Sequence, residues 1–261
     1  MIDKTPPTHT SKKELGILWL WQNTFILKGS TGTLLSIDPH LVRNPNAQYL
    51  SEPPIRPEEL QVDYVFCTHD HWDHADPRTL PIIAKSSPKT KFLGTRECRQ
   101  QFLNVGIPAE RTLALDAGVT VAFEGFNVTP LYSVPPKIAA RTRLTTHFGY
   151  VFDFGSVRLY NFGDSTPDTV ADPMSVLGEV AKYHPEIAIF PIVGDYPTRK
   201  PEDAVTFAKI LKPKVVIPGH YGCFSDRTID PNVFLKLMAA VPDMDTVIIR
   251  SGDWYIHRAN A

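Results

Sequence analysis

A stretch of six residues, 69–74, contains three histidines and two aspartates: His69, Asp70, His71, Asp73 and His74. Imidazole nitrogens bind borderline metals such as zinc, and carboxylates suit zinc, manganese or iron. A solvated loop that happens to be rich in histidine is the alternative, but five potential ligands within six residues disfavour it. The stretch therefore predicts a metal site.

Two more strand ends carry residues of the same kind. The histidine-rich stretch follows an apolar run, residues 62–67, which is typical of a buried strand. Two later apolar runs end in Gly163-Asp164 and Gly219-His220. Glycine lets the backbone turn so that the next side chain can enter a shared cavity. Asp164 alone could be an ordinary turn residue, and His220 an ordinary histidine at a strand end. Their repetition predicts one convergent rim of ligands.

Asp38 and His147 each admit two interpretations. Asp38 follows a predicted strand and either accepts hydrogen bonds that fix the histidine-rich loop or begins an Asp-Pro turn. His147 precedes a predicted strand and is either the third imidazole on a first metal or a plain strand-edge histidine. His40 could line the site, but a surface position is favoured.

The elements that must position these residues alternate between strands and helices. A long β-rich run, residues 16–28, is expected to form an antiparallel hairpin with residues 33–37 across Gly29-Ser30-Thr31-Gly32. Asp76-Pro77 resembles a helix start. Further helices are expected at 95–103, 172–183, 201–211 and 231–240, and further strands at 91–94, 112–115, 119–123, 126–131, 147–154, 157–162, 187–192, 215–217, 246–250 and 254–256. This order, with no linker, predicts a single domain over residues 1–261, with helices covering sheets and residues 1–14 forming a loose arm.

The composition excludes several function classes. A net charge of −1 and a pI near 6.8 give no electrostatic case for nucleic acid or an anionic membrane. The sequence contains no run of about 18 apolar residues, the length that a transmembrane helix requires. The polar N-terminal residues lack the apolar segment of a secretory signal. The three cysteines have no paired spacing that would indicate a disulfide framework. We therefore expect a cytoplasmic protein.

The separated motifs resemble those of the metallo-β-lactamase superfamily. They occur in order as His69-x-His71-x-Asp73-His74, Gly163-Asp164 and Gly219-His220. Within that superfamily the chain is similar to the L-ascorbate-6-phosphate lactonase branch over about residues 15–256, including the segments 68–76, 106–111, 159–165 and 214–220. The resemblance implies an αββα sandwich (two mixed β-sheets faced by helices), a small-molecule substrate, manganese or zinc as cofactor and a homo-oligomer. The superfamily's third-motif histidine would be sought near Tyr132, where there is none, and only His147 is available.

These residues suggest a hydrolytic mechanism on one or two divalent ions, Zn²⁺ or Mn²⁺. One ion is expected on His69, His71 and His147, and the other on Asp73, His74 and His220, with Asp164 between them. Metal-activated water would open a lactone such as L-ascorbate 6-phosphate or a related sugar lactone, and Asp73 would shuttle a proton. Arg199, Lys200, Arg141 and Arg143 are candidates to hold a substrate phosphate, or are simply solvated surface charges.

Two other functions are weighed against the lactonase. A small-molecule phosphodiesterase, acting on a cyclic nucleotide or another phosphodiester, would use the same pair of metals. The near-neutral charge argues against nucleic acid as substrate, but not against a small cyclic nucleotide. An iron-holding redox or sensor domain is the third candidate. The absence of a ferredoxin- or flavodoxin-type partner segment disfavours it.

Overall fold

The computed structural model describes residues 13–135, 146–164, 166–193 and 200–259. Within these ranges, two sheets of seven strands each make the centre of the molecule. The first sheet has the order β14 (Trp254–Arg258), β1 (Glu14–Trp21), β2 (Thr24–Lys28), β3 (Leu34–Ile37), β4 (Tyr64–Cys67), β5 (Lys91–Gly94), β6 (Thr112–Ala114). The second has the order β13 (Asp245–Thr246), β12 (Val215–Gly219), β11 (Ile187–Pro191), β10 (Arg158–Asn161), β9 (Phe148–Asp153), β8 (Phe126–Tyr132), β7 (Val121–Phe123).

Each sheet changes from antiparallel to parallel pairing part-way across. In the first sheet, β14 to β3 pair antiparallel and β3 to β6 pair parallel. In the second, β7 to β10 pair antiparallel and β10 to β13 pair parallel. The carboxyl ends of parallel strands meet at one edge of a sheet, so residues that follow β4, β10 and β12 are available to a common site.

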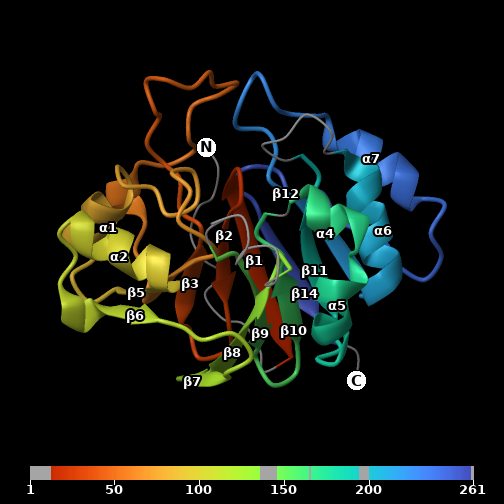
Figure 1. The fold of residues 1–261 in the computed structure, drawn as a ribbon, viewed down its shortest axis with the longest axis horizontal. Helices are drawn as coiled ribbons and strands as arrows, with labels where there is room; N and C mark the ends of the chain where they lie inside the picture. Colours follow the sequence, from red (N-terminus) through yellow and green to blue (C-terminus); the bar gives the residue numbers. More distant parts are fainter. Residues whose placement is uncertain (1–12, 136–145, 165, 194–199, 260–261) are drawn as a thin grey trace.

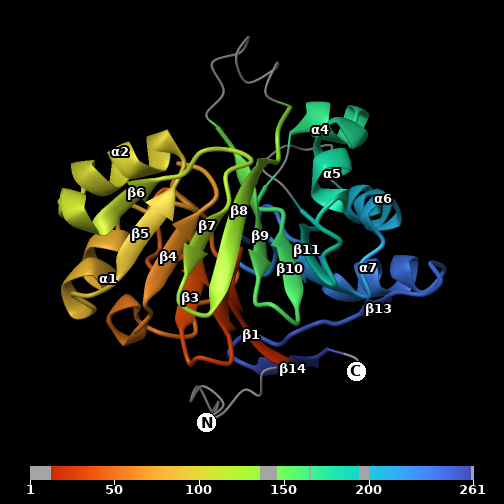
Figure 2. The same ribbon diagram turned by 90° about the horizontal axis from the view of Figure 1, so that it is seen from below.

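Helices cover the outer faces of both sheets. Figure 2 shows α1 (Leu80–Ser86) and α2 (Arg96–Asn104) beyond the first sheet, and α5 (Met174–Ala181), α6 (Pro201–Leu211) and α7 (Pro231–Met238) beyond the second. The short helix α4 (Pro167–Ala171) lies beside α5 and α6 (Figure 1), and two 3₁₀ turns, Pro57–Glu59 and Ala109–Arg111, precede β4 and β6. The αββα sandwich expected from the sequence is confirmed.

The alternation of side chains along β1 explains the layering. Leu15 and Ile17 belong to the apolar core shared by both sheets, whereas Leu18 and Leu20 belong to the separate core under α1 and α2. Successive side chains of a strand point to opposite faces. Because both faces of β1 are covered, the strand reads as one continuous apolar run. Each large side chain buried in this way stabilises the fold by about 1.5–3 kcal/mol.

Several element boundaries differ from the sequence predictions. The run at residues 16–28 is two strands, because the chain reverses at Gln22, which has a left-handed φ of 49°. The helix expected at Asp76-Pro77 begins only at Leu80 with Thr79 as its N-cap residue, since the Asp76 carboxylate accepts hydrogen bonds within the site.

Three further predictions need correction. The helix expected over 172–183 is α5 alone, which begins at Met174 after Pro173, and the separate short helix α4 precedes the expected range. The strand expected over 246–250 is reduced to Asp245–Thr246. Glu14 is not part of a loose arm, because it begins β1 and its carboxylate pairs with Arg258 at 2.9 Å. By contrast, helix α6 has the predicted bounds.

Candidate metal centre

The candidate site lies where the ends of β3, β4, β10 and β12 meet. The histidine-rich loop follows β4, Asp38 follows β3, Asp164 follows β10 and His220 follows β12 directly. Gly163 permits a close approach between the two sheets: it has a φ of +72°, and a Cβ there would lie 2.9 Å from the Thr68 side chain. The glycine before Asp164 therefore lets the rim of the second sheet reach the histidine-rich loop of the first.

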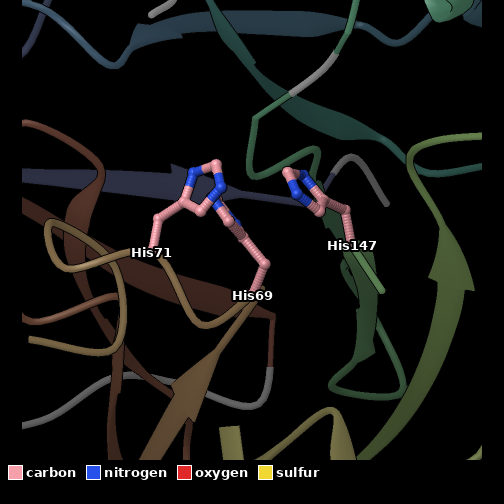
Figure 3. A group of neighbouring side chains, drawn as sticks. All are labelled: His69, His71 and His147. Atoms are coloured by element: carbon pink, nitrogen blue, oxygen red, sulfur yellow. The ribbon is translucent and has the colours of Figure 1, made fainter. Parts of the chain in front are cut away.

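Three imidazoles form a first group, which we call the first triad: His69, His71 and His147. Their rings face a common point (Figure 3), and each offers a nitrogen within 4.8 Å of the others. The ring centroids of His69 and His147 are 3.9 Å apart, and those of His69 and His71 are 4.4 Å apart. His69 and His147 are buried, while His71 is exposed.

Strand pairing brings His147 to the first triad, although His147 lies far along the chain from the histidine-rich loop. Ser133, next to the end of β8, donates its backbone N–H to the carbonyl of His147 at 3.0 Å. Phe148 donates its backbone N–H to the carbonyl of Thr68 at 2.9 Å. His147 thus lies beside Ser133, one residue past Tyr132, the neighbourhood where a histidine was sought and is missing from the sequence.

A second group, the second triad, contains Asp73, His74 and His220. The Nε2 atoms of His74 and His220 are 3.1 Å apart, and Asp73 Oδ2 lies 3.9 Å from the first and 4.0 Å from the second. All three side chains are buried. The spacing leaves room for one ion that all three atoms could bind.

Asp164 lies between the two triads. Its carboxylate forms a third potential metal group with His69 from the first triad and His74 from the second. Its Oδ2 also lies 4.0 Å from His220 Nε2. The residue is 3% exposed, so its charge is buried among imidazoles. A carboxylate in this place can contact ions held by either triad.

The Asp38 carboxylate stabilises the histidine-rich loop through hydrogen bonds. One of its oxygens accepts the backbone N–H of Thr68, and the other accepts the Thr68 hydroxyl and the amide of Asn23 and lies against His74 Nδ1, each at 2.7 Å. The contact to Nδ1 turns Nε2 of His74 toward the second triad. These contacts match the first of the two interpretations of Asp38, in which it accepts hydrogen bonds that fix the histidine-rich loop.

Burial and neighbouring charges pull the pKa values of these groups apart. Burial, with nearby imidazoles, holds the pKa of His69 well below its usual value and lowers that of His147 to about 3. Burial would also lower the pKa of His74, but the carboxylates of Asp38 and Asp73 outweigh it and raise this pKa to about 10. Burial alone would raise the pKa of Asp73, yet the charges of His74 and His220 lower it to about 2. Such divergent shifts are typical of functional sites.

Unsatisfied buried atoms indicate what the site is built to hold. His69 Nε2, His147 Nδ1 and Asp73 Oδ1 are buried without a hydrogen-bond partner. Buried polar atoms are normally paired, so three orphaned atoms in one place call for a ligand. Imidazole nitrogens and carboxylate oxygens in these groupings fit divalent transition metals. The donor set therefore fits one or two such ions.

Three of the four candidates for binding a substrate phosphate lie outside the described residues: Arg141, Arg143 and Arg199. Lys200 is exposed just before α6, where its backbone N–H donates to the Asp203 carboxylate.

Two polar residues lie beside the metal centre although the sequence favoured a surface position for His40 and did not include Gln22 among the candidates. His40 is fully buried rather than on the surface, with Nδ1 2.9 Å from Asp76 Oδ2 and Nε2 3.2 Å from the Tyr49 hydroxyl. Gln22 is also buried and contacts both Asp73 and His220. Neither residue belongs to a recognisable sequence motif. For His40, the sequence signal was its place in the Asp38-Pro39-His40 turn, directly after a predicted strand.

Known proteins share both the sequence pattern and the fold. Residues 16–220 match the family described as the Beta-lactamase superfamily domain. A metal-dependent hydrolase of the UPF0173 family from Archaeoglobus fulgidus is 31% identical over 92% of this chain and 97% of its own length. The corresponding hydrolase of Thermoplasma volcanium is also 31% identical, over 87% of this chain and 93% of its own. The chain belongs to the metallo-β-lactamase superfamily.

Within that superfamily the relatives are metal-dependent hydrolases, and so is this protein. Two solved structures share the fold. Igni18, a metallo hydrolase from Ignicoccus hospitalis, has a TM-score of 0.69 at 21% identity and covers 94% of this chain and 99% of its own. An isothiocyanate hydrolase from Delia radicum gut bacteria has a TM-score of 0.72 at 17% identity, with the same coverage. Across the described ranges, no helix has the length and apolarity that crossing a membrane requires.

Proposed function

We propose that this metallo-β-lactamase superfamily hydrolase opens a lactone ring, with L-ascorbate 6-phosphate or a related sugar lactone as substrate. The observation that supports hydrolysis on two metal ions is the position of Asp164 between two triads of metal-ligand atoms. In this proposal His69, His71 and His147 would hold one ion, Asp73, His74 and His220 would hold a second, and the Asp164 carboxylate would be within reach of either. The ions, Zn²⁺ or Mn²⁺, would supply a nucleophilic water at neutral pH and polarise the carbonyl under attack.

The protein's own side chains would hold these ligands in place and handle the proton. Asp38 orients His74 through Nδ1 at 2.7 Å. The Asp73 carboxylate presents Oδ2 to the second triad, while its Oδ1 is buried and has no hydrogen-bond partner. Asp73 Oδ1 is thus available to take a proton from the attacking water and pass it to the ring oxygen that leaves.

The choice of a lactone comes from the resemblance of the sequence motifs. A phosphorylated lactone would need a cation, and Lys200, Arg199 and Arg143 are our candidates for that role. A homo-oligomer and a cytoplasmic location are expected from the same resemblance and the composition. Light scattering of the purified protein tests the first of these.

Turnover of the proposed substrate is the direct test. Metal-free protein is reloaded separately with Mn²⁺ or Zn²⁺ and mixed with L-ascorbate 6-phosphate, and loss of the enediol absorbance is followed. We expect metal-dependent loss that disappears in His69→Ala and Asp164→Ala and persists in His184→Asn, which changes an exposed histidine away from both triads. Absence of turnover by protein with bound metal would rule out this substrate. Other lactones and small phosphodiesters would then be assayed.

A further inference from the structure

Gln22 enters the metal centre from the turn between β1 and β2. It is 1% exposed and has a left-handed φ of 49°, a conformation that a residue with a Cβ rarely adopts. Its backbone carbonyl accepts hydrogen bonds from Trp19 Nε1 at 3.0 Å and from the backbone N–H of His220 at 3.1 Å. These bonds hold the reversed backbone in place, so the side chain projects into the second triad.

The amide of Gln22 lies against two atoms of the second triad. Its Nε2 is 3.0 Å from Asp73 Oδ2 and 3.1 Å from His220 Nε2, and those two atoms are 4.0 Å apart. Bonds from a transition metal to nitrogen or oxygen ligands measure ~2.0–2.2 Å, so the point midway between Asp73 Oδ2 and His220 Nε2 suits an ion bound by both. From these three distances, Gln22 Nε2 lies roughly 2.3 Å from that midpoint, which is close enough for an atom in its position to bind the ion.

The orientation of the amide depends on what faces it. The nitrogen and oxygen of a glutamine amide occupy nearly equivalent positions, and hydrogen bonding decides between them. Beside the Asp73 carboxylate alone, the N–H points toward Asp73 Oδ2. A cation between Asp73 and His220 would repel that N–H and attract the carbonyl oxygen. Turning the amide by 180° about its last side-chain bond puts Oε1 in the position of Nε2.

We propose that Gln22 is a ligand of the second metal site through Oε1. The proposal rests on the metal centre assigned under the proposed function, but not on the identity of the substrate. With Gln22, the second site has four donors of its own (Asp73, His74, His220 and Gln22) in addition to the shared Asp164. Structural zinc favours four ligands, whereas manganese accepts six and suits amide and carboxylate oxygens. Gln22 therefore biases the second site toward Mn²⁺.

Shortening or charging this side chain tests the proposal through metal affinity. Gln22→Asn keeps a residue type that tolerates the left-handed backbone, but its amide is one methylene too short to reach. Gln22→Glu keeps the length and offers a carboxylate oxygen. Gln61→Asn, an equal shortening of an exposed glutamine, is the matched control. Mn²⁺ and Zn²⁺ are titrated into metal-free protein against a competing chelator, with Mn²⁺ followed by electron paramagnetic resonance and folding by circular dichroism.

We expect Gln22→Asn to weaken the second Mn²⁺ by about 10–100-fold and Zn²⁺ by much less, while Gln22→Glu binds Mn²⁺ at least as tightly as the wild type. Unchanged Mn²⁺ affinity in folded Gln22→Asn would overturn the proposal. Equal weakening in Gln22→Glu and Gln22→Asn would also overturn it, because that is the pattern of an amide that only donates to Asp73. No substrate is present, so failure of lactone hydrolysis leaves this result intact.

Discussion

The two triads differ in how firmly the surrounding protein holds them. In the second triad, His74 is fixed by Asp38 and Asp73 contacts Gln22, and all three side chains are buried. In the first triad, His71 is exposed, and His69 Nδ1 contacts the neutral Thr68 hydroxyl at 3.0 Å rather than a carboxylate. A site whose ligands are already oriented loses less conformational freedom when it binds. The second triad is therefore the better organised of the two, and we expect it to bind its ion more tightly.

The largest effect is expected at Asp164, which lies between the triads. Asp164→Asn removes the carboxylate charge that forms a third candidate group with His69 of the first triad and His74 of the second. Because charge stabilisation by metals contributes several kcal/mol to hydrolysis, we expect the rate to fall by about 10³-fold and both ions to bind more weakly. Metal content by mass spectrometry and the hydrolysis rate measure the two effects. Asp172→Asn, at an exposed position, is the control. Loss of only one ion would mean that Asp164 serves a single triad.

The sequence predicts the parts of this site that are local. The histidine-rich loop, Gly163-Asp164 and Gly219-His220 each follow an apolar strand, and the carboxyl ends of those strands do meet. Helix α6 was predicted with the correct bounds because Pro201 can occupy the first helical position and the apolar periodicity ends at Leu211. Spacing along the chain is enough for such features.

What the sequence could not predict depends on contacts between distant segments. His147 reaches the first triad only because β9 pairs with β8 and returns it beside Ser133. Gln22 lies within a long β-rich run, where the short polar interruption at Gln22-Asn23 does not by itself specify the reversal between β1 and β2. The side chain of His40 is buried by Asp76 and Tyr49, which come from two other loops. The sequence therefore leaves two interpretations open for His147 and favours a surface position for His40, because the contacts that decide both come from distant segments.

The second triad is expected to depend on Asp38 more than the first does. Asp38→Asn keeps the shape but removes the charge that lies 2.7 Å from His74 Nδ1. Outer partners of ligating histidines contribute 10–100-fold to metal affinity, so we expect a loss of about that size for the second ion. Chelator competition measures it, with Asp63→Asn as control, because the Asp63 carboxylate accepts a backbone N–H from Leu34 away from the site. An equal loss at both sites would remove the difference between the triads.

Acid should act on the metal-free protein through the first triad. The folded-state pKa of His147 is about 3, below the ordinary value of 6.5, so the unfolded chain binds the extra proton more readily. The resulting stability is complete above pH 6.5 and is lost as the pH falls toward 3. At pH 5 the loss from this group is about 2 kcal/mol. Urea unfolding at pH 7 and pH 5 measures it.

We expect His147→Gln to reduce the loss between pH 7 and pH 5 by about 2 kcal/mol, while His69, whose pKa is also held low, keeps the rest of the dependence. His184→Asn should leave the dependence as in the wild type. His74, in the second triad, contributes stability with the opposite pH dependence. The folded-state pKa of His74 is raised to about 10, so its contribution is complete below pH 6.5 and is lost only as the pH rises toward 10. A wild-type slope retained in His147→Gln would show that acid acts elsewhere in the molecule.

The smallest effect is expected at the edge of the second triad, where Tyr49 contacts His40. The Tyr49 hydroxyl accepts the backbone N–H of Asn44 at 2.7 Å and lies 3.2 Å from His40 Nε2. Tyr49→Phe removes both contacts, and we expect it to lower the free energy of unfolding by about 1 kcal/mol without changing metal content. Tyr255→Phe, which removes a 3.3 Å contact to His257 in β14, is the matched control. Metal content should stay unchanged because Asp38 and Gln22, and not Tyr49, contact His74 and Asp73. A fall in bound metal in Tyr49→Phe, but not in Tyr255→Phe, would show that the second triad also depends on the contact between Tyr49 and His40.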